Sequence, residues 1–191
     1  SKFKQEGVGV EFNDAQIIRA EDGGDVTGLA VMDQNVLIFH ERSVQYVEGV
    51  GTGSFSIPQP IASDVGCTDR NSIVRTPLGL MFKSAKGIYL LGRDLSVKYV
   101  GAAVESWNNY EVLSAVVIKD KNQIRFSLAN GHTLVFDYRV SQWSTFTNHP
   151  AKHAALWRGK YVWLASDGTV NQESAEFDDN GRRACVDTAF S

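Results

Sequence analysis

The fold is decided by residues 72–90, SIVRTPLGLMFKSAKGIYL, which hold three short apolar segments separated by turn-forming residues. The same arrangement recurs three more times along the chain. One large apolar residue marks the equivalent position of each copy: Phe39, Phe82, Phe126 and Leu164, at intervals of 43, 44 and 38 residues. A repeat of about 40 residues with three or four short strands is typical of a β-propeller blade.

We therefore expect an all-β fold: a β-propeller of about four small antiparallel blades, with little helix. The units cover residues 26–57, 72–100, 115–146 and 153–188, within a single domain spanning residues 1–191. Five blades remain an open alternative if the two ends of the chain form another. Asn-Gly or Asp-Gly pairs at positions 130–131, 167–168 and 180–181 predict tight hairpin turns, because these residues tolerate a positive φ angle.

Each unit also has a candidate outer strand, at residues 55–57, 97–100, 142–146 and 183–188. Residues 8–12 could pair with the last unit and close the ring, which would cover an exposed sheet edge. Residues 102–109 are the one stretch that predicts a helix. Because stacked repeats bury a shared core, we expect Phe82 and Phe126 to lie between neighbouring units.

The composition is that of an ordinary globular domain, with 43% apolar and 21% charged residues. The formal net charge is −3 and no run of Lys and Arg is present, which argues against a sequence-independent nucleic-acid binder. Cys67 and Cys185 are too few for a disulfide framework, so we expect free, buried thiols. No apolar run reaches the roughly 18 residues that span a bilayer. Both ends look like cut ends of a longer protein.

None of the candidate motifs for catalysis or ligand binding has strong support. Residues 49–54 are Gly-rich but lack the Lys of a phosphate-binding loop. His149 and His153 have the spacing of a helical zinc pair, but Pro150 argues against a helix. Residues 178–181 lack the alternating ligands of a calcium loop and predict a hairpin turn. Acidic candidates by residue type alone are Glu41, Glu48, Asp137 and Asp167. We expect no catalytic, cofactor-binding or metal-binding residue.

Four tryptophans could stack on sugar rings or fill the core: Trp107, Trp143, Trp157 and Trp163. Large aromatic side chains contribute much of the packing in protein cores, so we expect these four to be core residues. Trp163 alternates with Tyr161 along one predicted strand, so these two side chains should share a face.

Several motifs carry a family resemblance: LIFHERSVQY at 37–46, Gly66-Cys67, NSIVRTPLGLMF at 71–82, GIYL at 87–90, VESW at 104–107 and FDDNG at 177–181. In these motifs the chain resembles the propeller region of tail proteins from tailed bacteriophages. Its organisation is most similar to the tail nozzle, or packaged-DNA stabilisation protein, of short-tailed phages.

The resemblance implies a structural component of a phage or prophage tail, a nozzle or connector, and not an enzyme. It implies assembly with other tail proteins around the DNA exit channel, and a homo-oligomer for the full-length protein. It further implies synthesis in the bacterial cytoplasm, a final place in the virion, no specific nucleic-acid binding and no membrane insertion. The alternative is a carbohydrate-binding, lectin-like propeller, although the Asp-box repeat of many sugar-processing propellers is missing. An enzyme built on the same fold is a third option.

Overall fold

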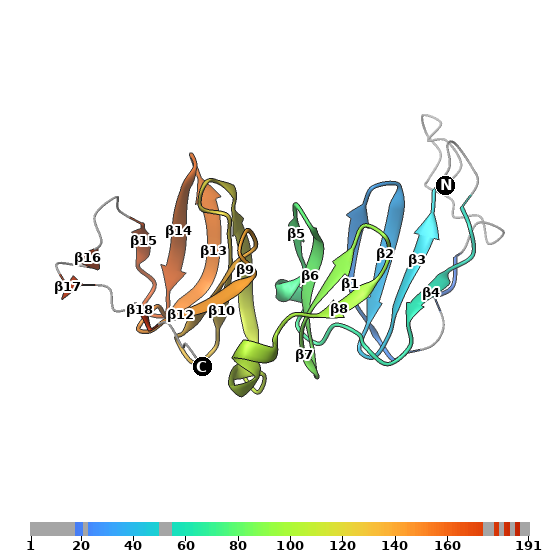
Figure 1. Ribbon diagram of the computed structural model, residues 1–191, viewed down its shortest axis with the longest axis horizontal. Helices are drawn as coiled ribbons and strands as arrows, with labels where there is room; N and C mark the ends of the chain where they lie inside the picture. Colours follow the sequence, from blue (N-terminus) through green and yellow to red (C-terminus); the bar gives the residue numbers. More distant parts are fainter. Residues whose placement is uncertain are drawn as a thin grey trace, which may run out of the picture.

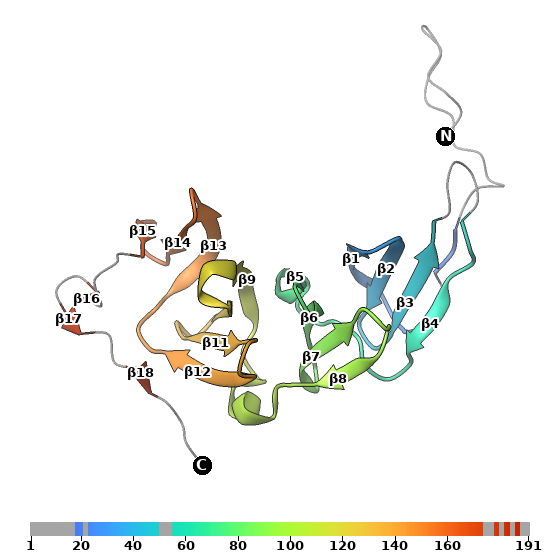
Figure 2. The ribbon, with the colours of Figure 1, turned by 45° about the horizontal axis from the view of Figure 1, so that its top comes forward.

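Four antiparallel β-sheets follow one another along the chain and lie side by side along an arc (Figures 1 and 2). The computed structural model describes residues 18–20, 23–49, 55–173, 178–179, 182–183 and 186–187. Within these residues the helices are short 3-10 turns. The expected all-β class with little helix is therefore confirmed.

Each sheet consists of strands that follow one another in sequence and pair with their neighbours. The first sheet contains β1 (Val26–Met32), β2 (Asn35–His40), β3 (Val44–Glu48) and β4 (Gln59–Ala62). The second contains β5 (Val74–Thr76), β6 (Gly79–Ser84), β7 (Gly87–Gly92) and β8 (Val97–Tyr99). The third contains β9 (Val112–Ile118), β10 (Gln123–Leu128), β11 (Thr133–Asp137) and β12 (Gln142–Phe146). The last contains β13 (Ala151–Trp157), β14 (Lys160–Ala165) and β15 (Val170–Gln172).

The remaining elements are short. The 3-10 turns are η2 (Arg70–Ser72), η3 (Ala102–Trp107) and η4 (Lys119–Lys121), and three two-residue strands follow the last sheet: β16 (Asp178–Asp179), β17 (Arg182–Arg183) and β18 (Val186–Asp187). The expected helix at residues 102–109 is thus a 3-10 helix, because Val104 has non-helical backbone angles of φ −120° and ψ 20°. The expected strand at residues 8–12 lies outside the described residues.

Two of the four expected outer strands lie where the sequence predicts them, at β8 and β12, and a third was misplaced. The outer strand of the first sheet is β4, and Phe55 forms only an isolated bridge to Gly49. Pro60 lies within β4 and pairs with Gln45. A proline is tolerated in β4 because this strand lies at the sheet edge, where a missing N–H breaks no ladder.

The expected outer strand of the last sheet, at residues 183–188, was also wrong. Strand β17 pairs with β16 in a separate hairpin, and β18 pairs with β12 as a fifth strand of the third sheet. The outer edge of β12 offers unpaired backbone groups to any extended segment nearby. The chain therefore leaves the third sheet, forms the last one and returns.

The turns between strands follow the residue types expected for them. Gly131 and Gly168 both adopt positive φ angles, of 83° and 88°, in the connections β10–β11 and β14–β15. The pair at 180–181 lies outside the described residues, between the paired strands β16 and β17. Arg158-Gly159, between β13 and β14, is a further turn with two positive φ angles.

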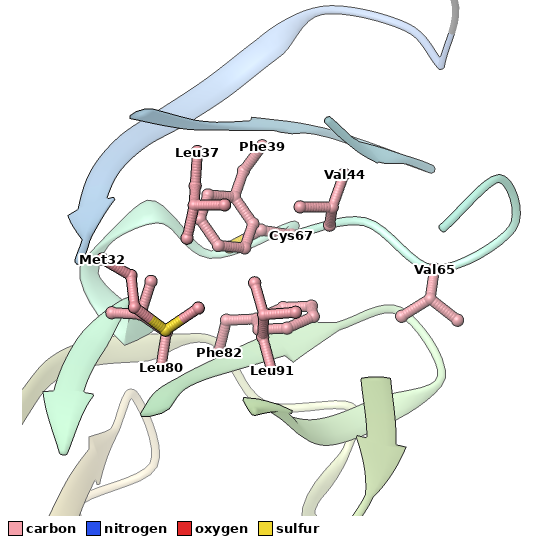
Figure 3. Close-up of a cluster of buried hydrophobic side chains, with 9 residues drawn as sticks. All are labelled: Met32, Leu37, Phe39, Val44, Val65, Cys67, Leu80, Phe82 and Leu91. Atoms are coloured by element: carbon pink, nitrogen blue, oxygen red, sulfur yellow. The ribbon is translucent and has the colours of Figure 1, made fainter. Parts of the chain in front are cut away.

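The first and second sheets enclose a wholly apolar core. In Figure 3, Leu37, Phe39 and Val44 of the first sheet point toward Leu80, Phe82 and Leu91 of the second. The rings of Phe39 and Phe82 meet edge to face, with centroids 5.1 Å apart. Such a pair adds about 0.5–1.5 kcal/mol to the free energy of burial. The expected place of Phe82 between two units is confirmed.

The second and third sheets enclose a second apolar core. Strand β6 serves both cores, because Leu80 and Phe82 face the first sheet while Met81 faces the third. Phe126 of β10 is fully buried in this second cluster, as expected. Trp143 packs beside Phe126 and donates its indole N–H to the carbonyl of Val100, at 2.8 Å.

One largely buried carboxylate links the connection between the first two sheets to the second and third sheets. Asp69 lies in the connection from the first sheet to the second, directly before η2. Its Oδ2 atom lies 3.1 Å from Nζ of Lys83 in β6 and accepts the backbone N–H of Val112 in β9 at 2.8 Å. The connection is thereby fixed to both neighbouring sheets. No helix among the described residues is long and apolar enough to span a membrane.

Candidate functional site

A groove runs beside β1, the edge strand of the first sheet. It is formed by residues 26–31 of β1 and by Arg70, Ile73, Arg75 and Leu80 from the start of the second sheet, and its volume is about 620 Å³. Strand β1 pairs with β2 on one side only among the described strands, so its other side offers backbone N–H and C=O groups. Such an edge is a template for another extended chain.

Gly28 determines how close the two walls of this groove come. A Cβ atom at this position would lie 2.5 Å from Cδ1 of Ile73, so a larger residue here would require the Ile73 side chain to move. Away from this contact the strand is open to solvent, with Leu29 66% and Val31 56% exposed. An edge strand with exposed apolar side chains is a surface that proteins usually cover or protect with charged residues.

The groove is positively charged. Arg70 and Arg75 are exposed on its second wall, and neither makes an ion pair with any acidic side chain of the described residues. The lining residues of the described chain include no carboxylate, histidine or thiol. Its charge and its open strand edge are complementary to an extended, acidic segment.

A second unusual place lies between the third and last sheets, where an arginine occupies the core. Arg125 of β10 is 2% exposed. Its guanidinium lies between the rings of Phe146 and Tyr161, 5.1 Å and 4.7 Å from their centroids. Both distances are within the range of cation–π attraction. Gln123 and Glu173 each accept a hydrogen bond from Nη2 of Arg125 at 2.9 Å.

Glu173 also binds Lys121, at 2.9 Å, so one carboxylate is shared by two cations. Burial alone would raise the pKa of Glu173, but hydrogen bonds from Arg125 and Lys121 outweigh this effect and hold the pKa below its usual value. Burial raises the pKa of the neighbouring Tyr161 hydroxyl. This cluster is saturated by its own partners, and its arrangement is that of a structural ion pair inside a sheet interface.

The acidic candidates from the sequence do not come together into one site. Glu41 and Glu48 are exposed in the first sheet, whereas Asp137 and Asp167 belong to the third and last sheets. The Asp137 carboxylate accepts the backbone N–H of Arg139 at 2.9 Å. Asp167 accepts the hydroxyl and backbone N–H of Thr169, and these hydrogen bonds lower its pKa. Both aspartates thus stabilise turns.

His149 and His153 are on irregular and extended backbone, as Pro150 predicted. The His149 Nδ1 atom lies 3.0 Å from the hydroxyl of Thr133, and its ring packs on Trp163 with centroids 4.3 Å apart. His153 is exposed in β13. Among the described residues, no group of three or more His, Cys, Asp or Glu side chains could hold a metal ion.

Three of the four tryptophans are partly buried and one is exposed. Trp107, Trp143 and Trp163 are partly buried in aromatic clusters, and Tyr161 and Trp163 stack with centroids 5.7 Å apart on one face, as expected. Trp157 is 63% exposed, so its expected role in a core is wrong. It lies at the end of β13, before the Arg158-Gly159 turn, and on the face turned away from the third sheet.

The expected buried, free thiol is found for Cys67, and Cys185 lies outside the described residues. Burial raises the pKa of the Cys67 thiol to about 11. The thiol is therefore protonated at neutral pH and offers no nucleophile. Gly49 of the Gly-rich stretch bridges to Phe55, and residues 50–54 lie outside the described part of the chain.

Sequence reasoning missed Asp69, Arg125 and Glu173. A signal for Arg125 exists, because Gln123–Leu128 alternates polar and apolar residues while both of its faces are buried. Such a strand must hide its polar face against something charged or polar. No comparable local pattern marks Asp69, which lies in a long polar connection.

Two comparisons find no relative: no family model matches the chain, and no curated protein matches it. Among solved structures, the extracellular domain of the putative one component system BT4673 from B. thetaiotaomicron is similar, with a TM-score of 0.56 and 10% identity. The match covers 89% of this chain and 25% of that chain. The computationally designed Ika4 protein matches over 90% of this chain and 98% of its own, with a TM-score of 0.49 and 14% identity. The first of these likenesses shows a shared fold of stacked β-sheets.

Proposed function

We propose that this chain is a segment of a β-propeller that serves as a structural part of a phage or prophage tail, a nozzle or connector that binds other tail proteins around the DNA exit channel. The β1 groove is the observation that carries the assembly role. Among the described residues, one edge of β1 has no strand partner and Arg70 and Arg75 have no ion-pair partner; with the exposed apolar side chains of β1, these features suit the addition of a strand from a partner protein.

The arrangement of the sheets supports the propeller part of the proposal. Three of the four sheets have four consecutive antiparallel strands; the first two junctions between neighbouring sheets each bury a shared apolar core, and the third buries Arg125 between two aromatic rings. The first strands, β5, β9 and β13, contact one another from sheet to sheet. In a propeller, the first strands of successive blades lie side by side around the axis. The viral part rests on the resemblance of the sequence motifs to tail proteins.

The groove is tested by reversing its charge. The double variant Arg70→Glu/Arg75→Glu should reduce binding to the partner tail protein by roughly tenfold or more, since like charges at an interface cost several kcal/mol. Arg139→Glu, an exposed arginine of the third sheet, is the matched control and should bind like the unmodified chain. Pull-down from phage-producing cells and mass spectrometry of purified virions provide the two measurements. Absence of the protein from intact particles would remove the viral role.

One observation favours the carbohydrate-binding alternative. Trp157 exposes its ring to solvent beside Arg158, whose guanidinium lies 5.6 Å from the ring centroid, and an exposed indole can stack on a sugar. A glycan array decides between the two functions. Binding that is abolished by Trp157→Ala would support a lectin, and an array without any signal would dismiss it.

A further inference from the structure

The open edge of β1 has a defined hydrogen-bonding pattern, which follows from the hairpin that joins β1 to β2. Met32 pairs with Asn35 across a two-residue turn, and the residues that flank such a turn form a hydrogen-bonded pair. Hydrogen-bonded and non-hydrogen-bonded pairs alternate along an antiparallel ladder. The backbone of Ala30 therefore bonds to β2, whereas the N–H and C=O groups of Leu29 and Val31 point to the open side of β1.

A groove separates β1 from the second sheet, although the inner strands of the other sheets touch. Strand β9 contacts both β5 and β13, but β1 has no comparable contact with β5. Residues 26–31 of β1 instead line the groove of about 620 Å³, opposite Arg70, Ile73, Arg75 and Leu80. Six strand residues extend over roughly 20 Å, so an extended segment of this length can lie along β1.

The two faces of a strand added to β1 would meet different surroundings. Its residues beside Leu29 and Val31 would share a face with these exposed apolar side chains. Its residues beside Ala30 would lie on the opposite face, because Ala30 packs against the core that the second sheet shares. Arg75 pairs with Leu80 of that same core, so the Arg75 side chain extends toward this second face.

Charge and backbone chemistry together identify the occupant as a peptide. Arg70 and Arg75 are exposed and have no ion-pair partner among the described residues, so a Glu or Asp side chain supplies the matching acceptor. Phosphate groups would also bind the guanidinium groups, but phosphate oxygens donate no hydrogen bond to the outward carbonyls of Leu29 and Val31. An extended peptide offers both donors and acceptors at the spacing of a strand.

We propose that the β1 groove takes an extended partner segment in which apolar and acidic residues alternate, and that this segment pairs with Leu29 and Val31 as an added strand. Its apolar side chains lie beside Leu29 and Val31, and its acidic side chains reach Arg70 and Arg75. The proposal rests on the assembly role proposed above for the same groove, and it specifies the kind of sequence that the groove selects.

The first test compares two fluorescein-labelled peptides of one composition and charge. Val-Glu-Val-Glu-Val-Glu-Val should bind the full chain at least roughly tenfold more tightly than its block isomer Val-Val-Val-Val-Glu-Glu-Glu, as measured by fluorescence anisotropy. The variant Arg70→Glu/Arg75→Glu should weaken binding of the alternating peptide by roughly tenfold, and the control Arg139→Glu should leave it unchanged. Equal affinity for the two peptides, an unaffected double variant, or no binding up to about 1 mM peptide would overturn the inference.

The second test isolates the backbone of β1. Leu29→Pro removes an N–H that points to the open side, a change that a sheet edge tolerates, whereas Leu29→Ala shortens the side chain but keeps the N–H. We expect a loss of affinity of roughly tenfold for Leu29→Pro and about threefold for Leu29→Ala. Equal losses would contradict strand addition. If Leu29→Pro changes the far-UV spectrum, the alternating peptide N-methylated at every second residue replaces it and should bind as weakly as the block isomer.

Two further measurements separate this inference from its alternatives. A labelled single-stranded oligodeoxynucleotide that binds more tightly than the alternating peptide, and loses binding in Arg70→Glu/Arg75→Glu, would overturn the inference in favour of a phosphate-binding groove. The peptide assay needs no phage component. Presence of the protein in virions without peptide binding would therefore remove only the inference, and peptide binding by a protein absent from intact particles would remove only the viral role.

Discussion

The first and last junctions of the arc solve the same packing problem with opposite chemistry. Between the first and second sheets, the core is made of Leu, Phe, Val and Met side chains with one thiol. Between the third and last sheets, a buried arginine lies between two aromatic rings and is neutralised by Glu173. Neighbouring sheets of this fold can thus pack against one another with either apolar or charged side chains between them. The stability of the charged junction depends on pH and on the presence of every ion-pair partner. The stability of the apolar junction depends on how closely its side chains pack.

The apolar junction should show the largest single effect. Phe82→Ala removes a fully buried ring from the edge-to-face pair with Phe39 and should lower the free energy of unfolding by about 3–5 kcal/mol. Urea denaturation followed by fluorescence measures this loss. Phe55→Ala removes a ring that is 61% exposed and should change stability by less than about 1 kcal/mol. Equal losses for the two variants would contradict the placement of Phe82.

At the polar junction, Arg125→Met keeps the side-chain volume but leaves Glu173 with Lys121 alone. We expect a loss of about 2–3 kcal/mol, because a partly buried carboxylate loses its hydrogen-bonded cation. The double variant Arg125→Met/Glu173→Met should recover part of this loss, since the one charge it leaves without its partner, Lys121, is 47% exposed and remains hydrated. If the single and double variants unfold at the same urea concentration, the ion pair does not hold the last sheet.

Two glycines at equivalent hairpin turns, Gly87 and Gly168, differ in how closely other side chains surround them. A Cβ atom at Gly87, where φ is 120°, would lie 2.7 Å from Tyr99 and 2.9 Å from Asn108, while Gly168, where φ is 88°, has no atom within 4 Å. Gly87→Ala should cost about 2–3 kcal/mol, from backbone strain and overlap together. Gly168→Ala should cost about 1 kcal/mol from strain alone. Thermal unfolding of the two variants gives the comparison.

The smallest expected effect is the change in unfolding free energy with pH that Glu173 causes. Because the folded state holds the pKa of Glu173 below its unfolded value of about 4.3, the carboxylate stabilises the fold above that pH. This stabilisation is lost as the pH falls from about 5 through the folded pKa. Glu173→Gln should flatten this part of the curve of unfolding free energy against pH. Glu111→Gln, which alters an exposed carboxyl outside the cluster, should keep the shape of the original curve.

The sequence was sufficient for the sheets because each has its own local signals. Alternation, spacing and Asx-Gly turns placed β6, β7, β10, β11 and β14, and they located Phe82 and Phe126 in the cores. Pairing between segments that are far apart in the sequence has no local sequence signal of this kind. Strand β18 joins β12 and not the last sheet, because an edge accepts any extended segment that reaches it. The β1 groove and the Arg125 cluster likewise depend on contacts between units, which periodicity does not encode.

The carboxylate of Asp69 has a mechanical consequence. It anchors the connection that leaves the first sheet to Lys83 of the second sheet and to the first residue of β9 in the third, so one side chain links this segment to both sheets. The last sheet lies at the end of the arc and most of β13 is exposed. It is joined to the third sheet by the Arg125–Glu173 pair and by the Ser114 hydroxyl of β9, which bonds the N–H and the carbonyl of Ala154. Strands β13–β15 should therefore unfold locally before the other sheets, and their amide protons should exchange with solvent before those of β6 and β10.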